Sequence, residues 1–201
     1  MSVSEQRGRK PRADVQRNRA ALLETAQRHF LQYGVGTSLE AVAKEAGVGP
    51  GTLYRHFPTR EALLAAVLQT RSEELVARQA DIEQLGDPAE ALEQWLRAME
   101  EYFSAFSGLP DPLMAAARAQ EPDNPLTIPC GILISATDQY VRAAQRAGRV
   151  RASVRGNDLF LAACSIAWIK GAGVEEESLD RLRTLIASGY RQQDTQQDIQ
   201  A

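Results

Sequence analysis

Apolar residues recur at the spacing of α-helices along most of this 201-residue chain, and no segment shows convincing β-strand alternation. The clearest case is a run with apolar residues at i, i+3, i+4 and i+7, namely Leu39, Val42, Ala43 and Ala46. Ser38 can cap the start of this short helix, and Gly47 has the backbone freedom needed to end it. Pro50 then suits the first position of a second short helix, which Leu53 and Phe57 anchor. Two short helices joined by a glycine turn predict a helix-turn-helix.

Two small residues, Ala43 and Gly47, lie where the two short helices are expected to cross. We expect a larger side chain at either position to displace the second helix. The turn that follows, Gly49-Pro50-Gly51, is unusually bare of side chains.

Longer helical patterns flank this motif. The pattern predicts a first helix from Asp14 to about Tyr33 and a fourth from Arg60 to about Leu85, which links the two halves of the chain. Five further helices are predicted at about 89–106, 113–119, 126–147, 157–169 and 178–190. We therefore predict an all-α protein of about nine helices, divided into a flexible basic arm (1–13), a helix-turn-helix domain (14–60), a second helical domain (61–190) and a disordered tail (191–201).

Charge separates the two ends of the chain. Residues 1–60 carry ten Lys/Arg against five Asp/Glu, a net charge of +5, whereas the remainder carries 13 against 21, a net charge of −8. The positive part coincides with the helix-turn-helix, as an electrostatic footprint on DNA phosphates requires. Arg7–Arg12 also resembles an AT-hook core interrupted by Lys10. Two interpretations of this arm stay open, namely insertion into the minor groove and a tail that adds only non-specific affinity.

Several classes of function find no support in the sequence. The two cysteines, Cys130 and Cys164, lack metal-ligand spacing and are interpreted as buried reduced thiols, in preference to a redox-sensing Cys130 near a helix start. No apolar run approaches the ~20 residues of a membrane span, and the N-terminus lacks the apolar segment of a secretory signal. Both histidines lie in the helix-turn-helix half, without a nucleophile–base pair. We predict a cytoplasmic protein with no catalytic residue, metal or cofactor, and no membrane partner.

The second short helix belongs to a longer motif. It reads GTLYRHFP at residues 51–58 and REALL at 60–64, after LLETA at 22–26 and TSL at 37–39. Over roughly residues 14–65 these segments resemble TetR/AcrR-family transcriptional regulators, almost without gaps. The resemblance implies a homodimeric repressor that binds double-stranded DNA at a palindromic operator and is released by a small-molecule effector. The alternative from another class is an architectural DNA-binding protein without an effector.

The resemblance also implies roles for side chains of the second short helix. Tyr54 and His56 are expected to hold phosphates, while Thr52 and Arg55 read bases or adjacent phosphates. Arg55 is the best base reader by chemistry, because its guanidinium can bond both O6 and N7 of guanine. The alternative places Tyr54 in the core and makes His56 a helix cap.

Further DNA contacts are expected around this helix. Ser38 lies at a helix N-terminus, where a phosphate can bind. Many family members have Ser or Thr and Lys where this chain has Gly49-Pro50, so the backbone amides of Gly49 and Gly51 are expected to approach the phosphates instead. The remaining candidates are the basic side chains Lys44, Arg60, Arg9 and Arg12.

By the same resemblance the middle of the chain is the sensor, where apolar residues can line a pocket between helices. The candidates are Trp95, Met99, Tyr102, Phe103, Phe106, Met114, Arg118, Ile134 and Trp168. Arg118, the only charged candidate, would pair with an acidic ligand. Ordinary core packing of these residues stays open as an alternative. The ligand would favour a conformer in which the fourth helix swings and the recognition helices no longer match successive grooves.

Reading a palindrome requires two copies, with recognition helices ~34–36 Å apart. The predicted helix at 157–169 is too apolar all round for a helix that faces solvent. With the last helix it is expected to form a four-helix bundle across a dimer. The interface candidates are Leu159, Ala163, Ile166, Leu182, Leu185 and Ile186. The alternative is that the helix at 157–169 is only a central core helix.

Overall fold

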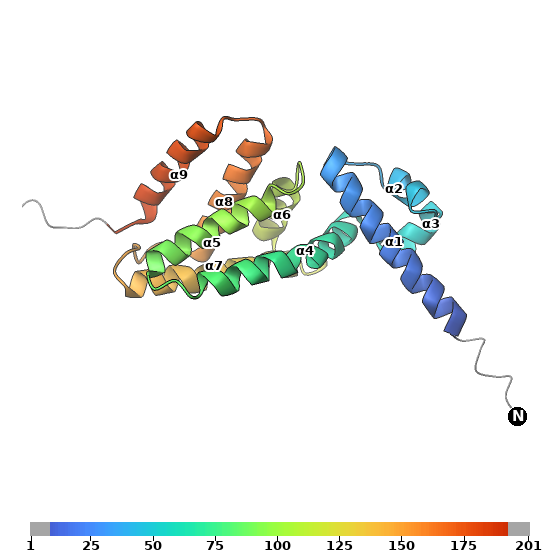
Figure 1. Cartoon of the computed structure of the whole chain (residues 1–201), viewed down its shortest axis with the longest axis horizontal. Helices are drawn as coiled ribbons and strands as arrows, with labels where there is room; N and C mark the ends of the chain where they lie inside the picture. The colour runs from blue at the N-terminus through green and yellow to red at the C-terminus, as the bar shows by residue number, and fades with distance from the viewer. Residues whose placement is uncertain (1–8, 193–201) are drawn as a thin grey trace, which may run out of the picture.

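The computed structural model describes residues 9–192, which form nine helices and no strand beyond an isolated bridge between Val150 and Arg191. The helices are α1 (Arg9–Tyr33), α2 (Leu39–Glu45), α3 (Pro50–His56), α4 (Arg60–Ile82), α5 (Pro88–Phe103), α6 (Pro110–Ala119), α7 (Thr127–Arg146), α8 (Gly156–Gly171) and α9 (Glu176–Tyr190). Figure 1 shows α1–α3 at one end of an elongated molecule and α5–α9 at the other, with α4 running between them. The all-α prediction is confirmed.

Two predicted boundaries are wrong. Helix α1 begins at Arg9, five residues before the predicted start at Asp14, so the last part of the predicted arm is helical. At the other end, the predicted tail begins with ordered residues, because the amide of Gln192 donates to the carbonyl of Arg149 at 2.8 Å. The rest of the arm (1–8) and of the tail (193–201) lies outside the described residues.

The helix-turn-helix packs on α1 through side chains that are fully buried. Leu22, Ala26 and Phe30 of α1 share one core with Val42, Ala43 and Leu53 of α2 and α3. The Ser38 hydroxyl accepts a hydrogen bond from the Ala41 amide at 3.2 Å, which confirms the predicted cap of α2. This shared core holds α3 in place against α1 and α2.

The turn between α2 and α3 corrects one expectation. Gly47 has φ +71°, a conformation that favours glycine, but a Cβ built on it would meet nothing within 4 Å. Glycine is thus required there by the backbone conformation and not by a close approach of helices. Ala43, by contrast, is fully buried, and the neighbouring Val48 amide donates to its carbonyl at 3.0 Å.

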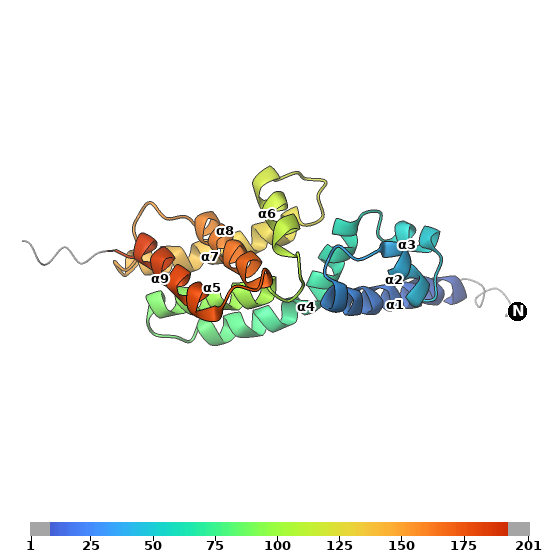
Figure 2. The ribbon, with the colours of Figure 1, turned by 90° about the horizontal axis from the view of Figure 1, so that it is seen from above.

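Helix α8 lies at the centre of the second domain, packed against α5, α6, α7 and α9 (Figure 2). Gly156, its first residue, permits the closest approach, because a Cβ there would lie 2.6 Å from the Asp138 amide nitrogen of α7. The Gly156 amide donates to the Asp138 carboxylate at 2.9 Å. Trp95 of α5 stacks on Tyr140 of α7 with ring centroids 5.3 Å apart. The second domain is therefore built around α8.

The cysteines lie in the same core. Cys130 is 1% exposed and donates through its sulfur to the Leu113 carbonyl at 3.6 Å. Burial raises the pKa of the Cys130 thiol to about 12 and also raises the pKa of Cys164. Both residues are free thiols, and their burial supports the interpretation as inert reduced cysteines rather than redox sensors.

Two connections join the domains. The first is α4 itself, and the second is the turn after α1, where the Val35 amide donates to the Ser107 carbonyl at 2.9 Å. Beside it, the rings of Phe30 and Phe106 meet edge to face at 5.8 Å. Gly34, at φ +77°, leaves no room for a side chain, because a Cβ would lie 2.7 Å from the Ser107 carbonyl oxygen. The DNA-binding domain is thus held at two points.

Candidate DNA-binding surface and ligand cavity

Helix α3 presents one buried anchor and a row of exposed polar groups. Leu53 is fully buried against the core, whereas Tyr54 and Arg55 are exposed and Thr52 is half-buried. Pro50 is the first residue of the helix, as predicted, after Gly49 in extended conformation. The local sequence therefore holds α3 by its inner side and leaves the outer side available to a ligand.

Arg55 and Lys44 are the exposed basic side chains of the two helices of the helix-turn-helix. The Arg55 Nε donates to the Gly51 carbonyl one turn earlier at 3.2 Å, which leaves the outer guanidinium nitrogens exposed. Lys44, on the last turn of α2, is exposed as well. Neither forms an ion pair with another described residue. Both side chains can thus meet an anion such as a phosphate without first breaking an internal pair.

A carboxylate joins two of the predicted phosphate contacts. Glu40, in the first turn of α2, accepts a hydrogen bond from the Ser38 hydroxyl at 2.9 Å and another from the Tyr54 hydroxyl at 3.0 Å. Bonds from its own backbone amide, Ser38 and Tyr54 lower the pKa of Glu40, and the same carboxylate raises the pKa of Tyr54. A phosphate that binds Ser38 and Tyr54 must compete with Glu40. The sequence analysis missed this residue, although an acid in the first turn of a helix is favoured by the helix dipole.

Nothing among the described residues requires glycine at position 49 or 51 of the bare turn. Neither Gly49 nor Gly51 has positive φ, and a Cβ built on either would meet nothing within 4 Å. Glycine within a helix is less favourable than alanine by roughly 0.5–1 kcal/mol. Their smallness is consistent with the close approach of an outside molecule, as predicted.

The structure gives the surroundings of four further predicted DNA contacts. Arg60 is committed internally, because its guanidinium donates to the carbonyls of Val35 and Thr37, both at 2.6 Å. These bonds hold the α1–α2 turn against α4, and a phosphate contact of Arg60 stays a prediction. His56 is half-buried beside the ring of Phe57. Arg9 and Arg12 belong to helix α1 rather than to an extended arm.

A second brace also escaped the sequence analysis. His29 of α1 is 6% exposed, and its Nε2 lies 2.7 Å from the Glu45 carboxylate of α2. Its Nδ1 lies 3.3 Å from the Thr37 hydroxyl, and Arg28 pairs with the same carboxylate at 3.1 Å. These bonds fix α2 to α1. The hydrogen bond from His29 is also the main reason that the pKa of Glu45 is lowered.

The second domain contains a cavity of about 560 Å³ between α4, α5 and α7. Its walls are Ala62, Ala65, Ala66, Leu68, Gln69, Leu75, Val76 and Gln79 of α4, Trp95 and Tyr102 of α5, and Pro125, Ile128, Pro129, Ile132, Leu133 and Ala136 near α7. This volume falls within the range of about 300–1,000 Å³ typical of small-molecule sites. Half of the residues that line the cavity belong to α4, the helix that joins the two domains.

The predicted pocket residues do not form one site. Trp95 and Tyr102 line the 560 Å³ cavity, whereas Phe103, Phe106 and Trp168 line a separate hollow of about 240 Å³ beside α6 and α8. Met99 is fully buried in the core, and Met114 and Ile134 are half-buried against it. Arg118 is exposed on α6. Ordinary core packing therefore describes several of the candidates, and Arg118 is not among the residues that line the 560 Å³ cavity.

Two family descriptions match the chain in consecutive segments. Residues 22–67 match "Bacterial regulatory proteins, tetR family", and residues 87–192 match "Transcriptional regulator SbtR-like, C-terminal domain". The crystal structure of the TetR transcriptional regulator SCO0520 from Streptomyces coelicolor is 34% identical, with a TM-score of 0.57, over 88% of this chain and 99% of that one. The chain belongs to the TetR family of bacterial transcriptional regulators.

Curated TetR-family relatives match over shorter segments. The HTH-type transcriptional regulator LmrA of Bacillus subtilis is 36% identical over 105 residues, which cover 49% of this chain and 56% of LmrA. UidR of Escherichia coli is 35% identical over 66 residues, which cover 32% of this chain and 34% of UidR. The chain thus spans about half the length of the first relative and a third of the second. None of the described helices is long and apolar enough to cross a membrane.

In this TetR-family chain the predicted dimer face is partly turned inward. Leu159, Ala163 and Ile166 of α8 are at most 3% exposed and line a hollow of about 160 Å³ between α5, α8 and α9. Ile186 also packs on the core, and Leu182 is half-buried. The large apolar groups that do face outward are Leu185 of α9, 71% exposed, and Trp168 of α8, 50% exposed.

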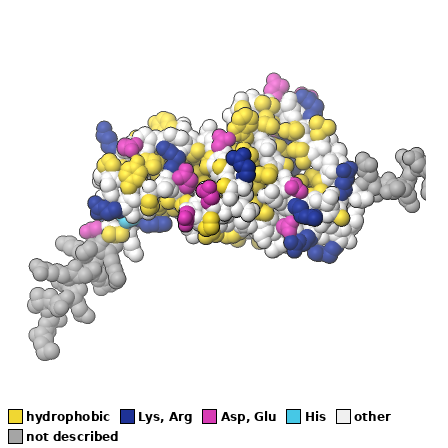
Figure 3. Space-filling view, turned by 180° about the vertical axis from the view of Figure 1, so that it is seen from behind, with side chains coloured by type: hydrophobic (Ala, Val, Ile, Leu, Met, Phe, Trp, Pro, Cys, Tyr) yellow, Lys and Arg dark blue, Asp and Glu magenta, His cyan; other side chains and the backbone are white. Residues whose placement is uncertain are grey.

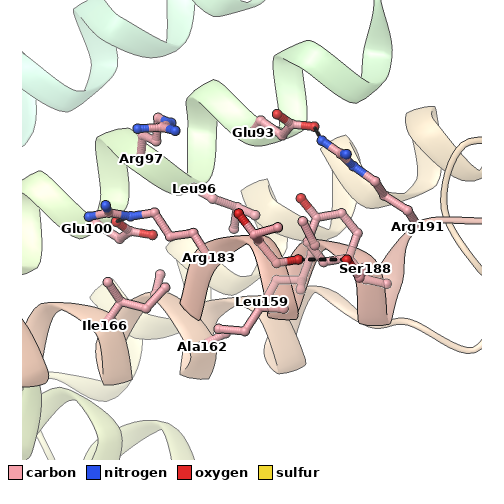
Figure 4. Close-up of a pocket in the computed structure, with 15 residues that line it drawn as sticks. Glu93, Leu96, Arg97, Glu100, Leu159, Ala162, Ile166, Arg183, Ser188 and Arg191 are labelled. Atoms are coloured by element: carbon pink, nitrogen blue, oxygen red, sulfur yellow. Dashed lines mark hydrogen bonds and ion pairs between the residues drawn. The ribbon is translucent and has the colours of Figure 1, made fainter. Parts of the chain in front are cut away.

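Ion pairs, one of them buried, hold α9 in place beside that hollow. Arg183 of α9 reaches Glu100 of α5 at 2.8 Å, and a second pair joins Arg191 to Glu93 (Figure 4). The Arg183 and Glu100 side chains are only 14% and 8% exposed. Desolvation raises the pKa of Glu100, while the bond from Arg183 acts in the opposite direction. The pair is therefore an internal link between α5 and α9.

Proposed function

We propose that this TetR-family chain is a sequence-specific DNA-binding regulator that represses transcription from a palindromic operator as a homodimer. The observation that carries the proposal is the arrangement of α3, anchored by Leu53 with exposed Tyr54 and Arg55 on its outer side. A helix held in this way can enter the major groove with its side chains against base edges.

Roles follow from the chemistry of each exposed group. Arg55 reads a guanine through its free guanidinium nitrogens, while Thr52 contacts a base or an adjacent phosphate. Tyr54, Ser38 and Lys44 hold phosphates and so fix the register of α3. The amides of Gly49 and Gly51 approach the backbone, helped by the absence of side chains. His56 adds a phosphate contact from the end of α3.

The dimer forms through the outward faces of α8 and α9. Trp168 and Leu185 are the large apolar side chains exposed there, and apolar patches of this kind mark interfaces. Leu161 and Ser165 share the face of Trp168, at i, i+4 and i+7. This face replaces Leu159, Ala163 and Ile166 of the sequence-based set, which are buried within the protomer.

The effector acts through α4. A small molecule in the α4–α5–α7 cavity touches the helix that begins four residues after the end of α3. Binding to one conformer shifts the population towards it. The bound conformer spaces the two recognition helices so that they no longer fit successive major grooves. A regulator that works in this way acts in the cytoplasm, where it reaches the DNA.

Selection of bound DNA from a random duplex pool tests the proposal. Wild-type protein is expected to enrich one palindrome with half-sites about 10–10.5 base pairs apart, or a multiple of that spacing, and to bind it as two protomers. Leu185→Glu is expected to abolish the two-protomer complex. Leu85→Glu serves as the control, because Leu85 is 37% exposed in the loop after α4. Failure to enrich any sequence, or undiminished dimers of L185E, would contradict the proposal.

A further inference from the structure

We propose that the ligand of the α4–α5–α7 cavity is an uncharged, mainly apolar molecule of several fused or linked rings. The inference rests on the proposed function, in that it names the chemical class of the effector. It replaces the acidic ligand expected from the sequence.

The described residues of the cavity wall carry no charged side chain. None of the described residues that line the cavity is Asp, Glu, Lys, Arg or His, and only Gln69 and Gln79 carry amides. An ionised group moved into such a wall loses its water without gaining a partner, which is strongly unfavourable. An uncharged ligand avoids this loss.

The polar atoms of the two aromatic wall residues already serve the protein. The Trp95 indole N–H donates to the Thr137 hydroxyl at 2.9 Å. The Tyr102 hydroxyl donates to the Leu68 carbonyl at 3.1 Å, and Gln79 donates to Glu83 at 3.0 Å. The aromatic faces therefore remain for contact with the ligand, while a ligand hydroxyl can still donate to the Tyr102 oxygen.

Three described charged residues of α4 lie outside the larger cavity. Arg71, Glu74 and Arg78 line a different hollow, of about 200 Å³, on the side of α4 that faces Ala98 and Glu101 of α5. Tyr102 and Leu75 belong to both hollows and separate them. The same helix thus keeps its described cations outside the larger cavity.

The mouth of the cavity exposes apolar surface that a ligand would cover. Ile128, Ile132 and Val76 on its walls are 72%, 64% and 61% exposed. Hydrophobic side chains gather over the second domain in the space-filling view (Figure 3). Covering such surface favours binding in proportion to the apolar area removed from water. An elongated polar ligand would gain little from these contacts.

The small wall residues place the ligand directly on the link between the domains. Ala62, Ala65 and Ala66 lie in the first two turns of α4, immediately after the DNA-binding domain. Methyl side chains allow a flat ring to approach the helix axis closely. A larger residue in their place would occupy the space that the ligand needs.

Binding of matched fluorescent probes tests the class of ligand. The probes are uncharged N-phenyl-1-naphthylamine, its 8-sulfonate, and the analogue with a trimethylammonium group at the same ring position. Wild-type protein is expected to bind one uncharged probe per protomer, at least about tenfold more tightly than either ion. Ala66→Trp and Ala136→Phe fill the cavity from α4 and from α7, and each is expected to reduce the uncharged probe's affinity at least about tenfold. Ala115→Trp, on the exposed side of α6, keeps it.

The outcomes separate this inference from the proposed function. Equal or tighter binding of an ion, or uncharged-probe binding that survives both filling variants, would overturn the ligand class. Thermal unfolding of each variant identifies one that fails to fold, and the other then carries the test. If the uncharged probe binds as expected but leaves the affinity for the selected DNA unchanged, the ligand class stands and effector-controlled release fails.

Discussion

Two groups of polar side chains in this molecule differ in whether the protein itself uses them. At the α5–α9 junction, Arg183 and Glu100 are buried and form an ion pair, and Arg183 also pairs with Glu176 and Asp180. On the helix-turn-helix, Arg55 and Lys44 are exposed and form no ion pair with another described residue. Removing one partner of a buried ion pair lowers the free energy of unfolding. Removing an exposed, unpaired charge leaves it almost unchanged. The comparison therefore separates residues that hold an element from residues available to DNA.

Arg183→Met is expected to have the largest effect, a loss of about 3 kcal/mol in the free energy of unfolding, because it leaves the Glu100 carboxylate buried without its partner. Denaturant titration measures it. Arg181→Met, which removes an exposed cation paired with Glu177, is the control and should change stability by no more than about 0.5 kcal/mol. Equal losses in the two variants would contradict the assigned link.

The Arg183→Met loss should depend on pH in a defined direction. Desolvation raises the pKa of Glu100 in the folded protein, so the folded state holds this proton more tightly than the unfolded state. Such a group contributes stability that is present below the unfolded pKa of about 4.3 and is lost as pH rises through the folded pKa. The deficit of R183M is therefore expected to shrink as pH falls towards that value. A deficit that grows on acidification would contradict this sign.

Arg55→Ala is expected to affect DNA binding and not stability, the opposite of R183M. It should weaken binding to the selected operator by about 1–3 kcal/mol and relax specificity at one base pair, with unchanged unfolding. Lys44→Ala is the matched variant, since loss of a phosphate contact weakens binding to all sequences alike. Wild-type sequence preference in R55A would show that Arg55 does not read a base.

Gly51→Ala is expected to separate stability from binding in a single variant. The new methyl meets no protein atom within 4 Å, so the fold should gain about 0.5 kcal/mol. Crowding of the DNA backbone should weaken operator binding by about 1 kcal/mol, roughly fivefold. Gly131→Ala, at an equally open position in α7, should show the gain alone. Undiminished DNA affinity of G51A would contradict the close approach.

Glu40→Gln is expected to give the smallest change. It removes the charge that competes with a phosphate for Ser38 and Tyr54, so operator binding should tighten by about 0.5 kcal/mol, roughly twofold. Glu24→Gln removes the same charge from an exposed position on α1. Equal tightening in both variants would mean that only net charge matters.

The sequence predicted the helix-turn-helix well because its signals are local. The Ser38 cap, Gly47 and Pro50 lie within 13 residues, and each acts on its immediate neighbours. The cavity was not predictable in this way, since α4, α5 and α7 assemble it from residues 62–136. Helical periodicity identifies Met99 and Trp95 alike as inward-facing, but only tertiary packing decides that one is core and the other a wall. The bonds of Arg60 to Val35 and Thr37 were not predictable either, because they also depend on tertiary packing.

The most direct test of the central claim is the distance between the two DNA-binding domains in the dimer. A spin label on Glu24→Cys reports it by double electron–electron resonance, because Cys130 and Cys164 are at most 1% exposed and resist labelling. The account predicts one defined distance on operator DNA, and a shift away from it when the uncharged naphthylamine binds the free dimer. Ala66→Trp should abolish that shift. An unchanged distance with the probe bound, or no distance between protomers at all, would contradict control of DNA binding through the α4 cavity.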